Sequence, residues 1–197
     1  MKELIIHYMQ QVLPYFSAAA AAFIISCLLT PLSIRVAGKI GAMDVPKDNR
    51  RMHTRAMPRF GGMAIFAGTE ISLAIFCHAD PKVITILIGG ALIYAVGALD
   101  DLKGLSAKLK FLLQILCAVV IYIGGIRIDF IKNPLYRILG DGCPVYIHFP
   151  LAVSVIITVI WIVGITNTIN LIDGLDGLAA GVAAIASGYI SYAAVLS

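Results

Sequence analysis

Long apolar stretches alternate with short polar ones along the whole chain. Six stretches are rich in Leu, Ile, Val, Ala and Phe, and they cover residues 12–34, 60–79, 83–99, 110–126, 150–166 and 178–197. A helix needs about 20 such residues to cross the hydrocarbon core of a bilayer. The pattern therefore predicts an all-α, polytopic membrane bundle of about six transmembrane helices, forming a single transmembrane domain over residues 1–197.

Composition supports this class. Of the 197 residues, 60% are hydrophobic and 13% are charged, and the mean hydropathy is +0.94. Soluble domains are about half apolar and about one quarter charged. The net charge of +4 gives no reason to expect nucleic acid as a partner, because the cations cluster beside the apolar stretches. Three of the four cysteines lie within apolar stretches, so neither a zinc site nor a disulfide framework is predicted.

The distribution of Lys and Arg predicts the orientation. Ten of the fifteen lie in or beside the loops at 35–59 and 100–109, and five lie on the opposite side. Loops rich in Lys and Arg face the cytoplasm. The N-terminus is therefore expected outside, and by parity the loop at 167–177 is expected in the cytoplasm too. All the polar motifs described next fall on this one side.

An acidic pair ends the third apolar stretch. Asp100 and Asp101 are followed by Lys103, and adjacent residues of a helix point about 100° apart. One carboxylate is thus able to contact a metal while its neighbour faces substrate or solvent. The alternative is an interfacial Asp that caps the following turn, which requires only one of the two. We favour a functional role for the pair.

A second acidic motif follows the fifth apolar stretch. Amide and carboxylate side chains recur there at every third position: Asn167, Asn170, Asp173 and Asp176. Gly174 and Gly177 allow the backbone to approach a ligand closely. A turn between two helices also favours Gly, Asn and Asp, but it needs only one or two of them. Oxygen ligands of this kind suit a hard divalent cation, so we expect metal or substrate binding.

The loop at 35–59 contributes cations. It contains His53 and ends in Pro58-Arg59, which precede Gly61 and Gly62 at the start of an apolar stretch. A helix N-terminus with an Arg beside it suits a phosphate group. The alternative is that these cations follow the orientation rule alone and contact anionic lipid headgroups. We consider Arg59 and His53 as substrate-binding candidates.

Two other features are interpreted as structural. Glu70 lies in the middle of an apolar stretch, where we expect it to be protonated or hydrogen-bonded within the bundle rather than catalytic. The longest outside loop, 127–149, contains turn residues and one segment typical of a short strand, 145–149. No chemistry is predicted there.

Taken together, three motifs resemble the polyprenyl-phosphate N-acetylhexosamine-1-phosphate transferases of glycosyltransferase family 4. They are Pro58-Arg59-x-Gly61-Gly62, Asp100-Asp101 and Asn167-x-x-Asn170-x-x-Asp173-Gly174-x-Asp176-Gly177-Leu178. That superfamily includes enzymes that begin teichoic acid, O-antigen of lipopolysaccharide and enterobacterial common antigen, and the translocase that makes lipid I. The form of the segment from Arg50 to Gly62 is similar to the undecaprenyl-phosphate GlcNAc-1-phosphate branch.

The resemblance implies a reaction and a place for it. The expected activity is transfer of N-acetylhexosamine-1-phosphate from a UDP-sugar to undecaprenyl phosphate, with release of UMP, at the cytoplasmic face of the bacterial inner membrane. It implies Mg²⁺, or Mn²⁺ in its place, held by Asp100, Asp101, Asp173 and Asp176, which are also the catalytic candidates. The candidates for substrate binding are Arg59, His53, Asn167, Asn170, Lys103 and Lys110. Homo-oligomers are compatible with the sequence.

The resemblance also implies further helices, with another Asp motif and a His-rich loop. This chain stops at Ser197 inside an apolar stretch. We therefore expect it to be the N-terminal part of a longer catalytic domain, and to be inactive alone. Two rivals stay open: a cation-coupled transporter, since membrane carboxylates also mark ion paths, and an inactive membrane fragment. A transporter is expected to carry its acidic residues near the midplane, whereas here only Glu70 is placed there.

Overall fold

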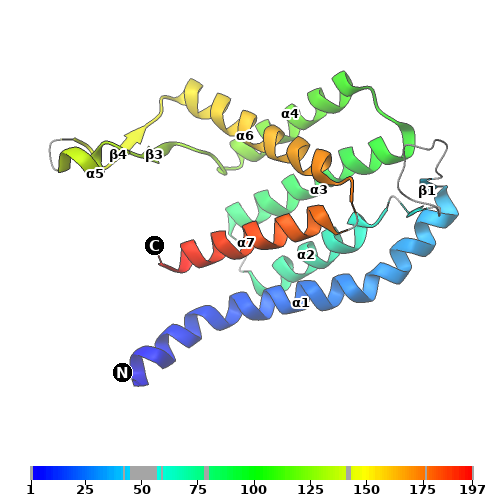
Figure 1. Ribbon diagram of the computed structural model, residues 1–197, viewed down its shortest axis with the longest axis horizontal. Coiled ribbons are helices and arrows are strands. Elements are labelled where there is room, and N and C mark those ends of the chain that lie inside the picture. Colours follow the sequence, from blue (N-terminus) through cyan, green and yellow to red (C-terminus); the bar gives the residue numbers. More distant parts are fainter. Residues whose placement is uncertain are drawn as a thin grey trace. The chain divides into compact units, whose positions relative to one another are not determined.

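A computed structural model describes residues 2–41, 43–44, 57–58, 60–77, 80–140, 143–175 and 177–196 (Figure 1). Most of these residues are helical. The chain divides into two compact units, Met1–Cys117 and Ala118–Ser197, and each is described by itself. Helix α4 (Ala107–Ile123) begins in the first unit and ends in the second.

The first unit contains three complete helices, which are α1 (Lys2–Ile40), α2 (Gly62–Phe76) and α3 (Pro81–Lys103). Two short strands, β1 (Met43–Asp44) and β2 (Met57–Pro58), pair antiparallel between α1 and α2. The chain therefore reverses direction, and α2 runs back along α1 (Figure 1). This reversal brings the Gly61-Gly62 start of α2 close to the C-terminal part of α1.

Small residues make the α1–α2 contact close. The buried positions of α2 are four residues apart: Ala64, Gly68 and Ser72. The Ser72 hydroxyl donates to the Ala18 carbonyl at 2.6 Å, and a Cβ added at Gly68 would lie 2.7 Å from the Ala22 carbonyl oxygen. Without a hydrophobic drive between helices in lipid, such short side chains are what permits tight van der Waals packing.

The start of α2 is fixed by α1. The Ser33 hydroxyl, which is fully buried, donates to the carbonyl of Phe60. The Met63 amide then donates to the same carbonyl at 3.2 Å, which begins the first turn of α2. The backbone just after the predicted phosphate-binding segment is therefore held in place by the packed helix pair.

Helix α3 packs on α2 through one ring stack and one glycine. It begins with Asp80 as N-cap, whose carboxylate accepts from the Lys82 amide at 2.7 Å. The rings of Phe66 and Tyr94 are parallel, with centroids 4.3 Å apart. One turn further from the loop, the carboxyl of Glu70 occupies the space that the missing side chain of Gly90 leaves. Glu70 thus lies within the helix pair, as expected of a structural role.

The second unit contains the end of α4, a hairpin and two helices. Strand β3 (Phe130–Lys132) pairs antiparallel with β4 (Tyr146–His148), and the short helix α5 (Tyr136–Leu139) lies between them in sequence. Helices α6 (Leu151–Ile172) and α7 (Leu178–Leu196) follow. The strand predicted at 145–149 is therefore confirmed, whereas its partner strand and α5 were not anticipated.

The all-α membrane class is confirmed. Within the described residues, three helices are long and apolar enough to cross a bilayer, and they cover Leu13–Ile40, Pro81–Lys103 and Leu151–Ile172. Helices α2 and α7 are shorter apolar helices, and α4 coincides with the remaining predicted span. The boundaries differ where polar residues continue a helix. Helix α3 includes Asp100 and Asp101, and α6 runs on to Ile172 rather than ending at 166.

Candidate functional site

A glycine turn ends α3 directly after the acidic pair. Gly104 adopts the left-handed conformation (φ 64°), and its amide donates to the Asp100 carbonyl at 2.7 Å. A residue without a Cβ adopts this backbone conformation at little cost, which is why glycine so often terminates helices. Three residues later α4 begins, so the turn returns the chain toward the carboxylates that it has just left.

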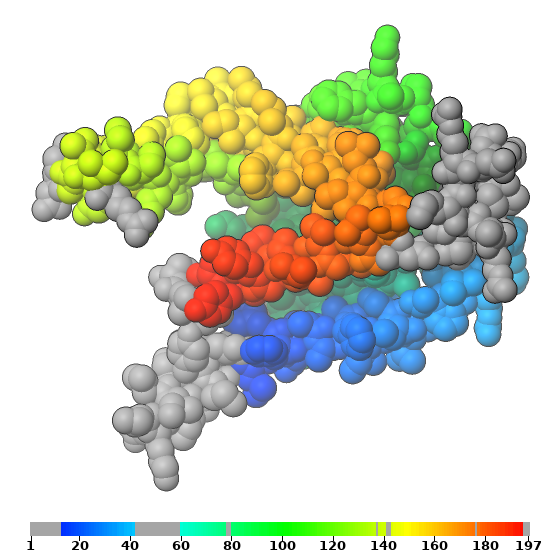
Figure 2. All heavy atoms as spheres, viewed as in Figure 1, coloured from blue at the N-terminus to red at the C-terminus, as the bar shows by residue number. Residues whose placement is uncertain are grey.

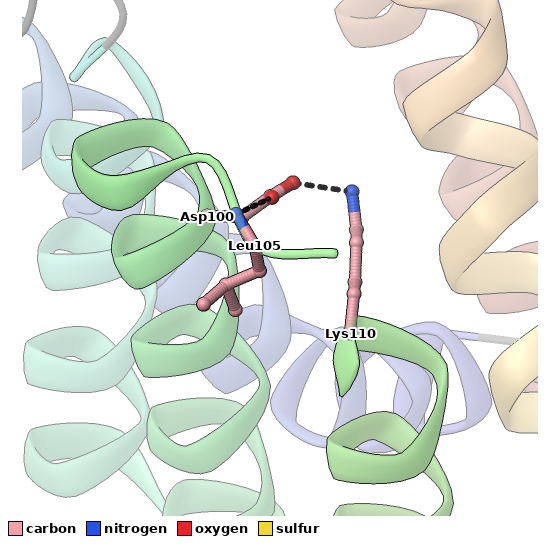
Figure 3. Close-up of polar contacts among 3 residues, drawn as sticks. All are labelled: Asp100, Leu105 and Lys110. Atoms are coloured by element: carbon pink, nitrogen blue, oxygen red, sulfur yellow. Dashed lines mark hydrogen bonds and ion pairs between the residues drawn. The ribbon is translucent and has the colours of Figure 1, made fainter. Parts of the chain in front are cut away.

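Asp100 is occupied by this turn (Figure 3). One carboxylate oxygen accepts from the Leu105 amide at 3.1 Å, and the other lies 2.7 Å from the Lys110 ammonium. Both side chains of the ion pair are largely shielded, with exposed fractions of 24% for Asp100 and 18% for Lys110. Shielding and direct hydrogen bonding make such a pair stronger than one exposed to solvent. Asp100 therefore joins α3 to the first turn of α4.

Asp101 instead lines a pocket. Its neighbours there come from two helices: Phe60, Gly62 and Met63 at the start of α2, and Tyr94, Gly97 and Ala98 along α3. The pocket measures about 150 Å³, whereas sites for drug-sized ligands are about 300–1,000 Å³. It is large enough for a small group such as a phosphate but too small for a complete nucleotide sugar.

The walls of this pocket have opposite electrostatic character. The N-terminus of a helix carries partial positive charge, and this end of α2 lies at Gly62, in the wall of the pocket. The Asp101 carboxylate supplies negative charge from the α3 side. A site of this kind binds a phosphate at the helix end and places a carboxylate beside it, able to accept a proton or to share a cation.

Tyr94 was not among the residues selected from the sequence. It lines the same pocket as Asp101, and its ring is held by the stack on Phe66. The sequence did contain a signal, because residues 94, 97, 98 and 101 follow the i, i+3, i+4, i+7 spacing of one helix face. The acidic pair by itself does not indicate that Tyr94 lies on the same helix face.

The second acidic motif lies at the end of α6. The Asn167 side chain donates to the Val163 carbonyl at 2.8 Å, and Asp173 is the exposed C-cap residue, whose amide donates to the Ile169 carbonyl at 3.1 Å. Asn170 lies one turn earlier and is exposed. Because residues three apart are neighbours on a helix surface, the three polar side chains follow one side of the helix end.

The turn after Asp173 depends on glycines. The Gly174 amide donates to the Ile172 carbonyl at 2.7 Å, and Gly177 has φ 77° before α7 begins. The C-terminal end of a helix carries partial negative charge, and α6 has no basic residue in its last turn. Asp173 therefore adds negative charge to an already negative helix end, an arrangement that favours a bound cation.

The remaining predicted residues are placed as follows. Lys103 is exposed in the last turn of α3, and Lys110 pairs with Asp100. His53, Arg59 and Asp176 lie outside the described residues. The α3 end belongs to the first unit and the α6 end to the second.

The described residues contain no complete metal centre. Among the described residues, no group of three or more His, Cys, Asp or Glu side chains is close enough to hold an ion. Asp100 is paired with Lys110, and the other described carboxylates of the two acidic motifs are Asp101 and Asp173. Their chemistry fits Mg²⁺, although neither is part of a complete ligand set within the described residues.

Comparison with known proteins identifies the family. The sequence model of glycosyl transferase family 4 matches residues 83–197, which contain both acidic motifs. The chain is 43% identical over 118 residues to a Bacillus subtilis protein named probable undecaprenyl-phosphate N-acetylglucosaminyl 1-phosphate transferase; the match covers 57% of this chain and 33% of that protein.

Two further relatives carry similar names. A Mycobacterium tuberculosis decaprenyl-phosphate N-acetylglucosaminephosphotransferase is 33% identical over 136 residues, 61% of this chain and 33% of that protein. A Salmonella typhi undecaprenyl-phosphate alpha-N-acetylglucosaminyl 1-phosphate transferase is 28% identical over 136 residues, 66% of this chain and 36% of the relative.

The matched part of this chain thus spans about a third of the length of these relatives. No solved structure matches it significantly. The family model covers more than half of the chain. The chain belongs to glycosyl transferase family 4.

Proposed function

We propose that this chain carries part of the active site of an enzyme that transfers N-acetylhexosamine-1-phosphate, with GlcNAc-1-phosphate preferred, from a UDP-sugar to undecaprenyl phosphate. In the reaction, an oxygen of the lipid phosphate becomes bonded to the phosphorus attached to the sugar, the diphosphate bond of the donor breaks, and UMP leaves. The product is a lipid diphosphate sugar that begins a cell-wall or surface polymer. The reaction takes place at the cytoplasmic face of the bacterial inner membrane.

One observation carries this proposal: the family match contains two helices that each end in carboxylates, and one carboxylate lines a phosphate-sized pocket. Asp101 faces the first turn of α2 across that pocket. A lipid phosphate is a group of the right size and charge for the helix end. Its hydrocarbon tail would remain among the apolar side chains of the bilayer.

The two neighbouring carboxylates have different roles in this proposal. Asp101 contacts the reacting groups, by accepting a proton from the lipid phosphate or by binding a cation beside it. Asp100 is a positioning residue, because its oxygens hold the turn and Lys110. Lys103 lies exposed at the same helix end and would attract the phosphate.

The α6 end supplies the donor side of the proposed site. Asn167, Asn170 and Asp173, together with Asp176, would bind the nucleotide sugar, while Arg59 and His53 would contact phosphate. Mg²⁺, with Mn²⁺ as a substitute, would be held by Asp101, Asp173 and Asp176, and when bound it would neutralise the diphosphate and stabilise the leaving UMP. Asp100 would take part only if its pair with Lys110 opened.

The direct test is an assay of membranes that carry the full reading frame encoding this chain. UDP-GlcNAc, undecaprenyl phosphate and Mg²⁺ are supplied, and UMP release and the lipid product are measured. We expect both products, loss of both after chelation with EDTA, and recovery when Mg²⁺ is returned. UDP-glucose is the control donor, since it lacks the acetamido group. The absence of lipid-linked sugar with UDP-GlcNAc in correctly inserted protein would contradict the proposal.

A further inference from the structure

Residues 126–140 and 143–149, here called the α4–α6 hairpin, are fixed to the first turns of a membrane helix. The Ile128 amide donates to the Thr158 hydroxyl at 2.9 Å, and the Ser154 hydroxyl donates to the Asp129 carboxylate at 2.7 Å. Ser154 and Thr158 are both buried. Thr158 lies about 10 Å along α6 from its first residue, at 1.5 Å per residue. The base of the hairpin therefore lies beside the first two turns of α6 and is not a stalk above them.

The tip of the hairpin is equally well fixed. Asn133 is buried, its amide donates to the Val145 carbonyl at 2.8 Å, and its side chain donates to the Pro144 carbonyl at 2.9 Å. The side-chain oxygen of Asn133 also accepts from the Leu135 amide at 3.0 Å, at the start of α5. The hairpin and α5 thus form one defined unit rather than a loose loop.

This unit exposes many apolar side chains. Ile131 and Ile147 are opposite each other in the strand register, so they share one face of the ribbon, and they are 45% and 40% exposed. Ile138 of α5 is 79% exposed, with Leu139 and Leu135 also exposed. No described residue covers them, and Figure 2 shows this segment, in yellow-green, continuing outward from the start of α6. In water, such a patch would expose substantial apolar surface.

The opposite face of the ribbon has the composition of a membrane interface. Phe130 and His148 form one register pair and Lys132 and Tyr146 the next, so all four share this face. The Phe130 ring contacts Tyr146 edge-on at 5.2 Å between centroids. Aromatic rings and Lys side chains with apolar stems are enriched at the headgroup level of bilayers.

A hollow lies beside the Lys132 side chain. It measures about 780 Å³ and is lined by Lys132, Asn133, Pro134 and Tyr136. The Lys132 ammonium beside this space suits a polar, anionic group. The phosphate of a phospholipid headgroup is the nearest such group to a segment tied to the first turns of α6.

We propose that the α4–α6 hairpin lies in the interfacial region of the bilayer, with its apolar side chains in the acyl region and Lys132 at the phosphate of an anionic phospholipid. Continuity with α6 determines its depth, and the charge of Lys132 selects the lipid class. The proposal concerns the position of the hairpin in the bilayer and does not depend on the transferase activity.

A depth measurement tests the first half of the proposal. Trp161 is the only tryptophan and lies midway along α6, so a Trp161→Phe background allows Ile147→Trp to report the hairpin alone. In nanodiscs, we expect strong quenching of this tryptophan by lipids brominated near the headgroup end of the acyl chain, and little quenching by aqueous iodide. Wild-type Trp161 is the reference for a deep position and should respond more to bromines near the bilayer centre.

Two results would overturn the inference. If iodide quenches Ile147→Trp as strongly as a free tryptophan derivative, the hairpin stands in water. If neither iodide nor brominated lipid reaches it, protein covers the hairpin, either another segment or a second copy.

The lipid class is tested with brominated phosphatidylglycerol and brominated phosphatidylcholine in mixed nanodiscs. One cation near a membrane surface corresponds to about a fivefold enrichment of the anionic lipid. We expect stronger quenching by the anionic lipid, lost in Lys132→Gln and retained in Lys132→Arg. Equal quenching by both lipids with native Lys132 would overturn the assignment of an anionic headgroup.

Discussion

Two acidic helix ends distinguish this molecule, and they are built differently. At the end of α3, Asp100 is held by the Lys110 ammonium and the Leu105 amide. At the end of α6, Asp173 is exposed and the last turn contains no basic residue. Helix ends of this polarity disfavour acidic residues. The α3 end therefore offsets its extra charge internally, whereas the α6 end is suited to receive a cation from outside.

The comparison also applies within the pair at the α3 end. Asp100 and Asp101 are adjacent, but the helix turns them to different surroundings, one toward α4 and the other toward the pocket. Because adjacent side chains of a helix point about 100° apart, two identical residues lie in different surroundings.

The largest effect expected is all-or-none, and it concerns whether both acidic ends face the cytoplasm. Cys143 lies in the α4–α6 hairpin, on the opposite side by the distribution of Lys and Arg. In a Cys77→Ser background, since Cys77 caps α2 at that same side, a membrane-impermeant thiol reagent should label intact cells through Cys143. Cys143→Ala is the control and should abolish labelling. Labelling only after the membrane is opened would contradict the shared cytoplasmic side.

Next in size is the loss of activity at the α6 end. Asp173→Asn and Asp176→Asn should each lower turnover by about 10²–10³-fold, because loss of one transition-state contact costs about 3–4 kcal/mol. Membrane insertion and protein amount should stay unchanged. Glu70→Gln is the matched control, since a hydrogen-bonding group in the helix pair is retained. Native turnover in both Asp variants would show that these residues only form the turn between α6 and α7.

A smaller effect is expected on the free energy of unfolding at the α3 end. Asp100→Asn and Lys110→Met should each destabilise the protein by about 1–2 kcal/mol, since a hydrogen bond to a charged group is lost. The double variant should lose less than the sum, which a thermal denaturation series in detergent would show. Strict additivity would mean that the pair contributes nothing to stability.

The smallest effect is a change in the free energy of unfolding that has opposite signs at the two helix ends. Asp173→Asn removes a negative charge from a negative helix end and should raise the free energy of unfolding by about 0.3–1 kcal/mol. The same change at Asp100 should lower it. The two variants are compared in one buffer of low ionic strength, and a loss of stability in Asp173→Asn would remove the contrast.

The sequence predicts the helices well because long apolar stretches leave few alternatives in a bilayer. It does less well where polar residues continue a helix. Helix α6 continues through Asn167 to Ile172, and the Asn167 side chain donates to the carbonyl four residues back, a contact that an apolar pattern does not reveal. The hairpin partner of β4 was missed for a related reason, since three-residue strands carry little periodicity.

For the site, the candidates could be named from the sequence but their division could not. The pairing of Asp100 with Lys110 requires the left-handed turn at Gly104, a three-dimensional event between two helices. The pocket beside Asp101 depends likewise on α2 returning along α1 and stacking Phe66 on Tyr94. Spacing along one helix indicates which residues share a face, but it does not identify the element that packs against that face.

Asp101→Asn and Asp100→Asn, compared in one transferase assay, show whether the two neighbouring carboxylates have different roles. Turnover is normalised to the amount of folded protein in each membrane preparation. We predict that Asp101→Asn loses about 10²–10³-fold in turnover per folded molecule, corresponding to about 3–4 kcal/mol. Asp100→Asn should lose at least tenfold less per folded molecule, together with a lower unfolding temperature. Equal losses in the two variants, or a greater loss in Asp100→Asn, would contradict the account.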